Sequence, residues 1–267
     1  MRLGVPKGVG KFAQNYRPKT NPDQLNRTGR EMAAVEDIRT TALSFHNMHE
    51  HGALFVNLLR ARRESFIVRN QWELPESGGL EYDQYDNPSS RWIGVHRGEE
   101  VLAGVRLTPT TAKCGMYSYM IRDAQLGLLP TIPSNLVNFK APVDPEIWEA
   151  TRIFVTASVP MRLRTQVQSM LLKSLIDVAA ENGAAQLIAF GPAVWSRWIG
   201  RLGLSAEPAG PVLEIEGSKA QVALMTLETK SELVDEVSDH HSAQTDNAGI
   251  IKRARLRRNL PATQAAE

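Results

Sequence analysis

The sequence of 267 residues is poor in several features that mark whole classes of protein. It has one cysteine, so no internal disulfide can form and a reducing compartment is expected. No apolar run approaches the ~18 residues of a membrane span, and the opening MRLGVPKGVGKF lacks the apolar segment of a secretory signal. The formal net charge of +2 is too small to indicate nucleic-acid binding. We therefore expect a cytoplasmic protein with no membrane span and no nucleic-acid partner.

The two ends of the chain differ in composition from its middle. The first 30 residues hold seven Lys or Arg and one acidic residue among many Gly, Pro and Asn, a mixture that cannot bury a core. The far end is polar and carries the basic run KRARLRR, which is compatible with RNA, DNA or anionic lipid but more often belongs to a solvated tail. We expect a flexible basic extension over 1–44, a folded domain over 45–228 and a polar, basic tail over 229–267.

The first half of the middle region predicts one helix and two strands. Within SFHNMHEHGALFVNLLRARRESF, four apolar residues fall on one helical face: Leu54, Phe55, Leu58 and Leu59. SRWIGVHRGEEVLAGVRL predicts two strands joined at Arg97-Gly98. In the second strand, the residues predicted to alternate inward are Val101, Ala103, Val105 and Leu107.

The second half predicts strand, helix, strand, helix and two final strands. IWEATRIFVTA is a buried-strand pattern that runs into a long helix, with Ser158 as its N-cap and Gly183 at its end. AQLIAF, PVLEIEG and QVALMTL predict strands, and GPAVWSRWIGRLG predicts a helix. This order indicates an α/β fold, a three-layer α/β/α sandwich around a mixed sheet.

An acidic loop in the stretch LEYDQYDNP raises the question of function. It places Glu81, Asp83 and Asp86 within six positions, with no lysine or arginine among them. A solvated turn is the simpler interpretation, because Asp, Asn and Pro are common turn residues. A pocket for a cationic small molecule is the alternative, because unpaired carboxylates are costly to bury.

Three further clusters contain aromatic or charged residues: R-x3-F-x5-W, GVRLTPT and WEATR. Each has an ordinary structural explanation when taken singly, since a Trp near a loop is usually core and a Glu–Arg pair is usually a surface ion pair. Their chemically active side chains are Arg62, Phe66, Trp72, Arg106, Glu149, Thr151 and Arg152.

Taken together in order and spacing, these clusters and E-Y-D-Q-Y-D resemble the acyl-homoserine-lactone synthases, the autoinducer synthases of bacterial quorum sensing. The resemblance implies an N-acetyltransferase-like fold and an acyltransferase. Such an enzyme moves an acyl chain from acyl carrier protein, or in some members from coenzyme A, to the amine of S-adenosylmethionine. Lactone closure then releases methylthioadenosine. S-adenosylmethionine is a substrate, so no cofactor and no metal are implied.

By this resemblance, nine residues fall on characteristic positions of the family: Arg62, Phe66, Trp72, Glu81, Asp83, Asp86, Arg106, Glu149 and Arg152. We expect Asp83 and Asp86 to hold the cationic groups of S-adenosylmethionine, and Arg106 or Arg152 to pair with its carboxylate. The aromatic pair of the first cluster, with Arg62 beside it, would offer a face to the adenine or the sulfonium.

The predicted catalytic set is Glu149, Glu81 and Arg152. Glu149 is expected to accept the proton of the amine, with Glu81 as the alternative. An ion pair between Glu149 and Arg152 is the simpler structural explanation. Strand alternation places Thr151 on the face of Glu149 and opposite Arg152 unless a bulge intervenes, and Thr151 is expected to touch the acyl chain.

The acyl chain needs an apolar tunnel, and the acyl donor needs a docking surface. We expect Leu171, Leu175 and Leu187 to line the tunnel, and Arg162 and Arg164 to receive an acidic carrier protein.

Two other functions remain open from the sequence. An N-acyltransferase would acylate another amine without forming a lactone, and would release no methylthioadenosine. A non-catalytic relative would act as a binding protein through its basic ends, although charged residues without a function are costly to retain in a core.

Overall fold

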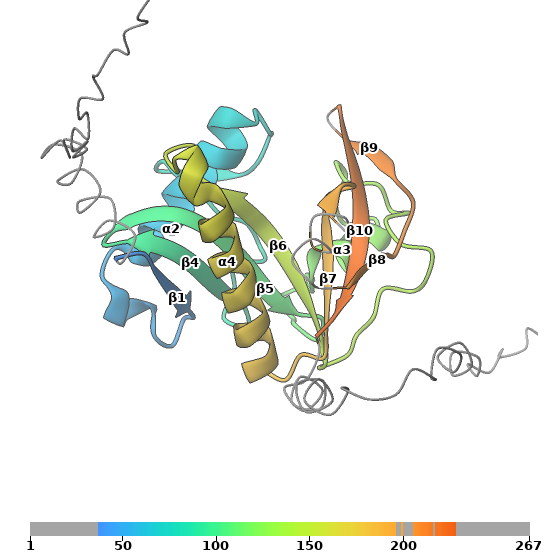
Figure 1. The fold of residues 1–267 in the computed structure, drawn as a ribbon. Helices are drawn as coiled ribbons and strands as arrows, with labels where there is room; N and C mark the ends of the chain where they lie inside the picture. Colours follow the sequence, from blue (N-terminus) through green and yellow to red (C-terminus); the bar gives the residue numbers. More distant parts are fainter. Residues whose placement is uncertain (1–36, 196–198, 200–204, 216, 228–267) are drawn as a thin grey trace, which may run out of the picture.

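A mixed sheet forms the centre of the molecule, in the strand order β1-β4-β5-β6-β7-β10-β8 with β9 paired to β10 (Figure 1). The computed structural model describes residues 37–195, 199, 205–215 and 217–227. The strands of this sheet are β1 (Arg39–Leu43), β4 (Arg91–Arg97), β5 (Glu100–Pro109), β6 (Ile147–Val155), β7 (Gln186–Pro192), β8 (Ala206–Pro208), β9 (Leu213–Ile215) and β10 (Ser218–Thr226). The paired strands are antiparallel, except for the parallel pair β6 and β7.

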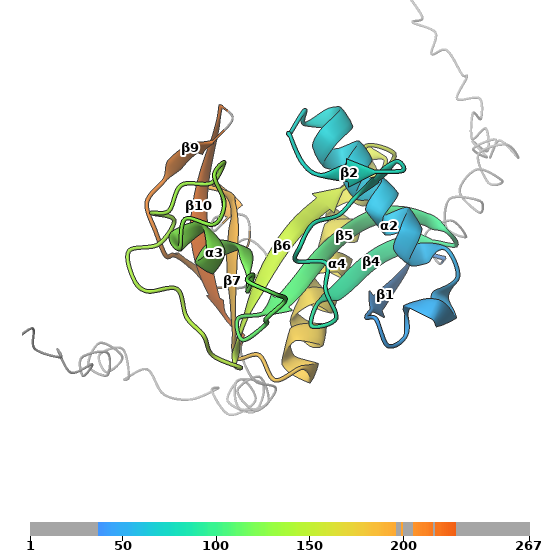
Figure 2. The ribbon, with the colours of Figure 1, turned by 180° about the vertical axis from the view of Figure 1, so that it is seen from behind.

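Helices cover both faces of this sheet. α4 (Met161–Glu181) lies on one face and α2 (Leu54–Arg63) on the other, as the opposite views of Figures 1 and 2 show. α2 follows a 3₁₀ turn (Met48–His51) and runs into a π-helical segment (Glu64–Arg69), while α3 (Met120–Gln125) packs against β7 and β10. β2 (Glu76–Ser77) and β3 (Leu80–Glu81) form a separate two-stranded ribbon. The predicted three-layer α/β/α sandwich around a mixed sheet is confirmed.

β5 illustrates how the two helical layers bury the sheet. Ala103, Val105 and Leu107 pack in the core with α4, as their alternation predicts, whereas Val101 packs in a second cluster with Leu58 of α2. The other face of β5 is covered by α2, since a Cβ added at Gly104 would lie 3.0 Å from Leu58. The polar Arg106 and Thr108 on this second face are therefore buried as well.

β6 and β7 separate after a short paired stretch. Their register runs from Ile147 opposite Gln186 to Ala150 opposite Ala189, and the two strands then diverge (Figure 1). This divergence opens the sheet beside α4, and the site described below lies at that opening.

Two boundaries differ from the sequence prediction. Residues 39–43, expected within the flexible extension, form the edge strand β1, which pairs with β4 through Leu43 opposite Trp92. The strand β1 was not predicted because its five residues alternate only weakly between apolar and polar side chains. Its pairing partner, β4, lies about 50 residues further along the chain. Ser158 is not the N-cap of the long helix, because α4 begins at Met161 after Pro160, and the Ser158 hydroxyl instead lies 3.0 Å from that of Thr156.

The other predicted elements follow the sequence closely. The β4–β5 hairpin turns at Gly98, with a φ of 55°, and α4 ends before Gly183, with a φ of 84°. Most of the helix expected over GPAVWSRWIGRLG, the remaining N-terminal extension and the tail over 229–267 lie outside the described residues. Among the described helices, none combines the length and apolar character needed to cross a membrane.

Candidate active site

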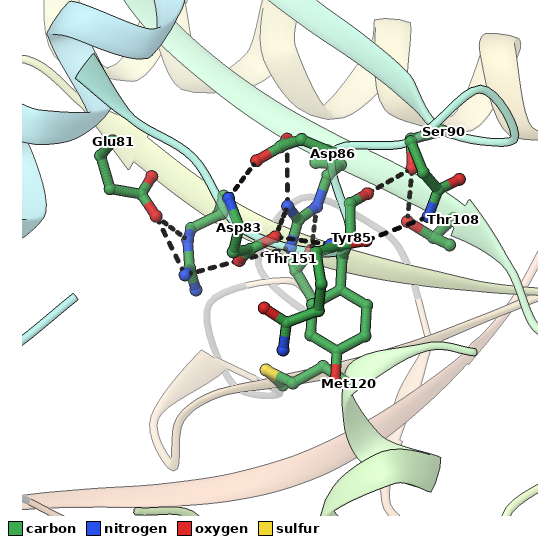
Figure 3. A network of polar contacts seen from close by, with 12 residues as sticks. Glu81, Asp83, Tyr85, Asp86, Ser90, Thr108, Met120 and Thr151 are labelled. Carbon is green, nitrogen blue, oxygen red and sulfur yellow. Dashed lines mark hydrogen bonds and ion pairs between the residues drawn. The ribbon is translucent and has the colours of Figure 1, made fainter. Parts of the chain in front are cut away.

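The acidic loop, whose Glu81, Asp83 and Asp86 are labelled in Figure 3, lies against three arginines from three different elements. Arg62 comes from α2, Arg106 from β5 and Arg152 from β6, at separations of 19 to 71 residues from their acidic partners. We call the whole set the ion cluster: Arg62, Glu81, Asp83, Asp86, Arg106 and Arg152. The sequence placed no basic residue inside the loop, and the fold supplies the basic residues from elsewhere.

Arg62 binds two carboxylates at once. It continues the stripe of Leu54 and Leu58 on α2, so helical spacing directs its side chain toward the sheet, where it is 1% exposed. Its Nε donates to Glu81 at 2.5 Å, and its two Nη atoms donate to the Asp86 carboxylate at 2.7 and 3.0 Å. Such a forked pair fixes both the position and the orientation of the loop.

Asp83 receives the other two arginines. Arg106 donates to its two oxygens at 2.5 and 3.2 Å, and Arg152 donates to Oδ2 at 2.8 Å. Arg106 Nε also donates to the Thr151 hydroxyl at 3.1 Å, and Arg152 Nε donates to Glu81 at 3.0 Å.

A bulge turns Arg152 into this cluster. Arg152 has a φ of 54°, and the β5–β6 register shifts beside it, so two residues of β6 stand opposite one residue of β5. Arg152 therefore lies on the same side as Thr151, whereas regular strand alternation would place it on the opposite side. The sequence allowed for a bulge at this point of the strand, and the bulge is present.

The ion cluster holds three positive and three negative side chains, and its electrostatics follow from their mutual attraction. Burial alone would raise the pKa of Asp86, but Arg106 and Arg62 outweigh it and lower that pKa below its usual range. The pKa of Asp83 is lowered for the same reason, by Arg106 and Arg152. All three arginines are thus engaged, so none is reserved for an external carboxylate.

An aromatic pair borders the cluster. Phe66 and Trp72 stack with ring centres 5.2 Å apart and an interplanar angle of 10°. The Arg152 guanidinium lies 5.8 Å from the Phe66 ring centre. Phe66 is buried, whereas Trp72 is 36% exposed, so this pair is accessible from the Trp72 side.

Glu149 is buried, and no arginine of the described residues forms an ion pair with it. Its two oxygens accept hydrogen bonds from the backbone N–H groups of Met120 at 3.0 Å and Ile121 at 2.8 Å, at the start of α3. Burial raises the pKa of Glu149 to about 7, although these two bonds and Arg106 act in the opposite direction. The proposed ion pair with Arg152 is wrong, because Arg152 bonds to Glu81 and Asp83 instead.

A cavity of about 660 Å³ lies where β6 and β7 diverge. Leu171 and Leu175 of α4 and Leu187 of β7 line it, as expected for an apolar tunnel. Phe154 lines the cavity and also packs edge-on against Phe66 at 5.8 Å, so the Phe154 ring lies between the cavity and the aromatic pair.

Comparison with known proteins identifies the family. A family model described as autoinducer synthase matches residues 46–237. The chain belongs to the autoinducer synthase family. The resemblance seen in the sequence is therefore confirmed.

Individual autoinducer synthases agree with this assignment. An acyl-homoserine-lactone synthase from Ralstonia solanacearum is 31% identical over 166 residues, which are 60% of this chain and 76% of that protein. The solved structure of a CoA-dependent acyl-homoserine lactone synthase, BjaI, with SAM and isopentyl-CoA is 23% identical, with a TM-score of 0.59 over 78% of this chain and 91% of that one. TofI in a ternary complex with an inhibitor and MTA is 24% identical, with a TM-score of 0.56 over 74% and 96%. These two structures show that the fold is shared.

The structure brings most of the predicted autoinducer synthase residues together. Seven of them are joined by hydrogen bonds or ion pairs: Arg62, Glu81, Asp83, Asp86, Arg106, Thr151 and Arg152. Phe66 and Trp72 border this group, and Glu149 lies two residues before Thr151 on β6. Their contact with a ligand stays a prediction.

Sequence reasoning missed the residues that support this autoinducer synthase site. Trp92 donates its indole N–H to Asp86 at 2.8 Å, and Tyr85 lies with its ring 5.6 Å from the Arg106 guanidinium. Asp123 is fully buried and accepts a hydrogen bond from Tyr85 at 3.0 Å. The position of Tyr85 within E-Y-D-Q-Y-D was the one available signal, because Trp92 and Asp123 lie outside the four motifs.

Proposed function

We propose that this autoinducer synthase makes an acyl-homoserine lactone from S-adenosylmethionine and an acyl thioester of acyl carrier protein or coenzyme A. The observation that carries the proposal is the buried carboxyl of Glu149, which is held by two backbone amides of α3 and is followed on β6 by Ala150, a residue that lines the cavity. Family membership supplies the reaction class, and the site supplies groups suited to each step. We assign the reaction to the folded domain and to the cytoplasm.

S-adenosylmethionine binds beside the aromatic pair and the ion cluster. Trp72 and Phe66 offer a stacked face to the nucleoside or sulfonium, a contact worth about 1 kcal/mol or more when dry. The ammonium and carboxylate of the substrate replace part of the Asp83 and Arg152 pairing. Such an exchange keeps charges paired, because the substrate brings both signs.

Glu149 accepts the proton that the amine must lose. A free α-amine has a pKa near 8, and the raised pKa of Glu149, about 7, makes it a matched acceptor directly or through one water. Glu81, the alternative, is ion-paired through its two oxygens with Arg62 and Arg152, whereas the two oxygens of Glu149 are bonded to neutral backbone amides.

In the first step the ammonium loses one proton to Glu149, and the free amine attacks the thioester carbon. The carbon–sulfur bond breaks, and the second proton that the nitrogen loses passes to the leaving thiolate, which departs as a thiol. The substrate carboxylate then attacks the carbon next to the sulfonium, whose bond to sulfur breaks to release neutral methylthioadenosine. Because the sulfonium is a good leaving group, orientation supplies most of the second step.

The acyl chain occupies the cavity. Leu171, Leu175 and Leu187 surround its apolar part. Thr151 follows Ala150, which lines the cavity, but its own hydroxyl faces Arg106, so contact between Thr151 and the first carbons of the chain requires the chain to pass the ion cluster. Arg164 lines the cavity and donates to the Thr156 carbonyl at 3.3 Å, at the end of β6. We place the docking of an acidic carrier protein at this rim, around Arg162 and Arg164.

The test is a product assay on the purified protein. S-adenosylmethionine is incubated with acyl carrier protein or coenzyme A thioesters of different chain lengths, and products are measured by mass spectrometry. We expect acyl-homoserine lactone and methylthioadenosine in equal amounts. Acylated amine without methylthioadenosine would establish the N-acyltransferase alternative, and no product with any donor would overturn the proposal.

A further inference from the structure

Asp123 is a second carboxylate buried outside the ion cluster. It is 0% exposed, and its Oδ2 accepts hydrogen bonds from the Tyr85 hydroxyl at 3.0 Å and the Ser118 backbone N–H at 2.9 Å. Its Oδ1 accepts from the Ser118 hydroxyl at 2.6 Å. Within the described part of the chain, no lysine or arginine forms an ion pair with it. A buried carboxylate that accepts three hydrogen bonds holds the groups that donate them, here Tyr85 and Ser118, in fixed positions.

These donors connect two parts of the site. Ser118 lies just before α3, whose first two N–H groups, at Met120 and Ile121, hold Glu149. Tyr85 belongs to the acidic loop, and its ring lies beside Arg106 of the ion cluster. Figure 3 shows Tyr85 reaching from that loop toward Met120. One carboxylate therefore joins the loop of the ion cluster to the turn that presents Glu149.

We propose that Asp123 is a positioning residue for acyl transfer: through Ser118 and Tyr85 it holds Glu149 and the ion cluster in one fixed arrangement. This inference rests on the proposed function and deepens it. Asp123 touches no reacting group, because its contacts are Ser118 and Tyr85. Its effect reaches the reaction through the two amides of α3.

The charge of Asp123 adds an electrostatic effect that can be measured. Burial contributes most to the raised pKa of Glu149, and Asp123 raises it further while Arg106 lowers it. Tyr119 and Tyr85 also face Glu149, and their pKa values are raised, chiefly by burial, so both stay neutral near pH 7. Removing the charge at Asp123 therefore lowers the pKa of Glu149.

The decisive variant is Asp123→Asn, measured as kcat and KM against pH. We expect kcat to fall by about tenfold or more, KM for S-adenosylmethionine to change less than about threefold, and the acidic limb of kcat to move to lower pH. Tyr85→Phe removes one donor and keeps the charge, so kcat should fall less and the limb should stay. Asp177→Asn, which removes an exposed partner of Lys173 on α4, is the control and should change neither.

A second readout does not depend on catalysis. The Glu149 carboxyl is titrated by infrared difference spectroscopy, with Glu149→Gln identifying its band, and the midpoint should be lower in Asp123→Asn than in the wild type. An unchanged midpoint together with an unchanged kcat, in a variant that is only less stable, overturns the inference. If the wild type forms no lactone, the proposed function fails, and the infrared comparison still decides whether Asp123 acts on Glu149.

Two further variants apply if Asp123→Asn does not fold. In Ser118→Ala and Tyr85→Phe, a lower kcat at constant KM supports the positioning role of Asp123, and unchanged kinetics overturn it.

Discussion

Asp86 and Glu149 are both buried carboxylates of one site, yet their environments are opposite. Asp86 accepts a forked pair from Arg62 and lies 3.0 Å from Arg106, so its pKa is lowered. Glu149 is bonded to two backbone amides instead, and burial raises its pKa to about 7. Burial raises the pKa of both carboxyls, and whether the carboxyl is charged at neutral pH depends on its nearest partners, which are arginines for Asp86 and neutral amides for Glu149.

This difference separates two tasks within the site. Asp83 and Asp86 keep their negative charges over the whole physiological range because their pKa values are lowered, so they are suited to holding a substrate in place. Glu149 changes its protonation near neutral pH, so it is suited to moving a proton. Groups whose environments push their pKa values apart are a common arrangement in enzymes that use acid–base chemistry.

The largest effect should come from removing the proton acceptor. Glu149→Gln keeps the shape and the amide contacts but cannot accept a proton, so we expect kcat to fall by about 10²–10⁴-fold. KM for S-adenosylmethionine should change by less than about threefold, because the ion cluster is untouched. Steady-state kinetics test this, and an unchanged kcat would assign the proton to another group such as Glu81.

Breaking the ion cluster should destabilise the fold instead. Arg62→Met leaves Glu81 and Asp86 short of a partner in the core, and loss of one member of a buried ion pair costs about 3–5 kcal/mol. Arg63→Met is the matched control on the next residue of α2, where a part-exposed arginine pairs with Glu76 at the surface and little change is expected. Urea unfolding at pH 7 compares the two. Equal losses would show that the ion cluster does not differ energetically from a surface pair.

The pH dependence of stability should separate Glu149 from Asp86. The pKa of Glu149 is raised from 4.5 to about 7 on folding, so its contribution is fully present below pH 4.5 and lost as pH rises through 7. Relative to Glu149→Gln, the wild-type free energy of unfolding should fall by roughly 2–4 kcal/mol across that range. The pKa of Asp86 is lowered from 3.8, so its contribution is present above pH 3.8 and lost as the pH falls further.

Urea unfolding of the wild type, Glu149→Gln and Asp86→Asn between pH 3 and pH 8 measures both contributions. The difference between wild type and Asp86→Asn should be constant from pH 5 to pH 8. A flat difference for Glu149→Gln over the same range would mean that Glu149 ionises as an ordinary carboxylate.

A smaller effect should follow from Thr151→Val. This change removes the hydroxyl that accepts from Arg106 Nε and leaves that buried N–H without its acceptor, at a cost of about 1–2 kcal/mol. Chemical denaturation measures the loss, and product analysis measures acyl-chain selectivity in parallel. Altered selectivity at unchanged stability would place the hydroxyl against the acyl chain rather than in the ion cluster.

Sequence pattern predicted the elements with strong local signals. The turn at Gly98 and the stop at Gly183 follow from local chemistry, since both positions need a positive φ that glycine adopts easily. The helical start at Ser158 was wrong because Val159 would then have to be helical directly before Pro160, and a residue before proline is driven out of the helical region. The strand over residues 39–43 was missed because edge strands depend on a distant partner.

The chain by itself determined which residues are present and in what order, and that was enough to indicate the family, the layers and the acidic loop. Only the tertiary structure decided which arginine pairs with which carboxylate. Arg62, Arg106 and Arg152 reach the loop from three separate elements, and a bulge turns Arg152 inward. Glu149, in contrast, accepts its hydrogen bonds from two backbone amides of α3. The physical reason is that a carboxylate's proton affinity depends on the charges within a few ångströms of it, and folding selects those neighbours from distant parts of the chain.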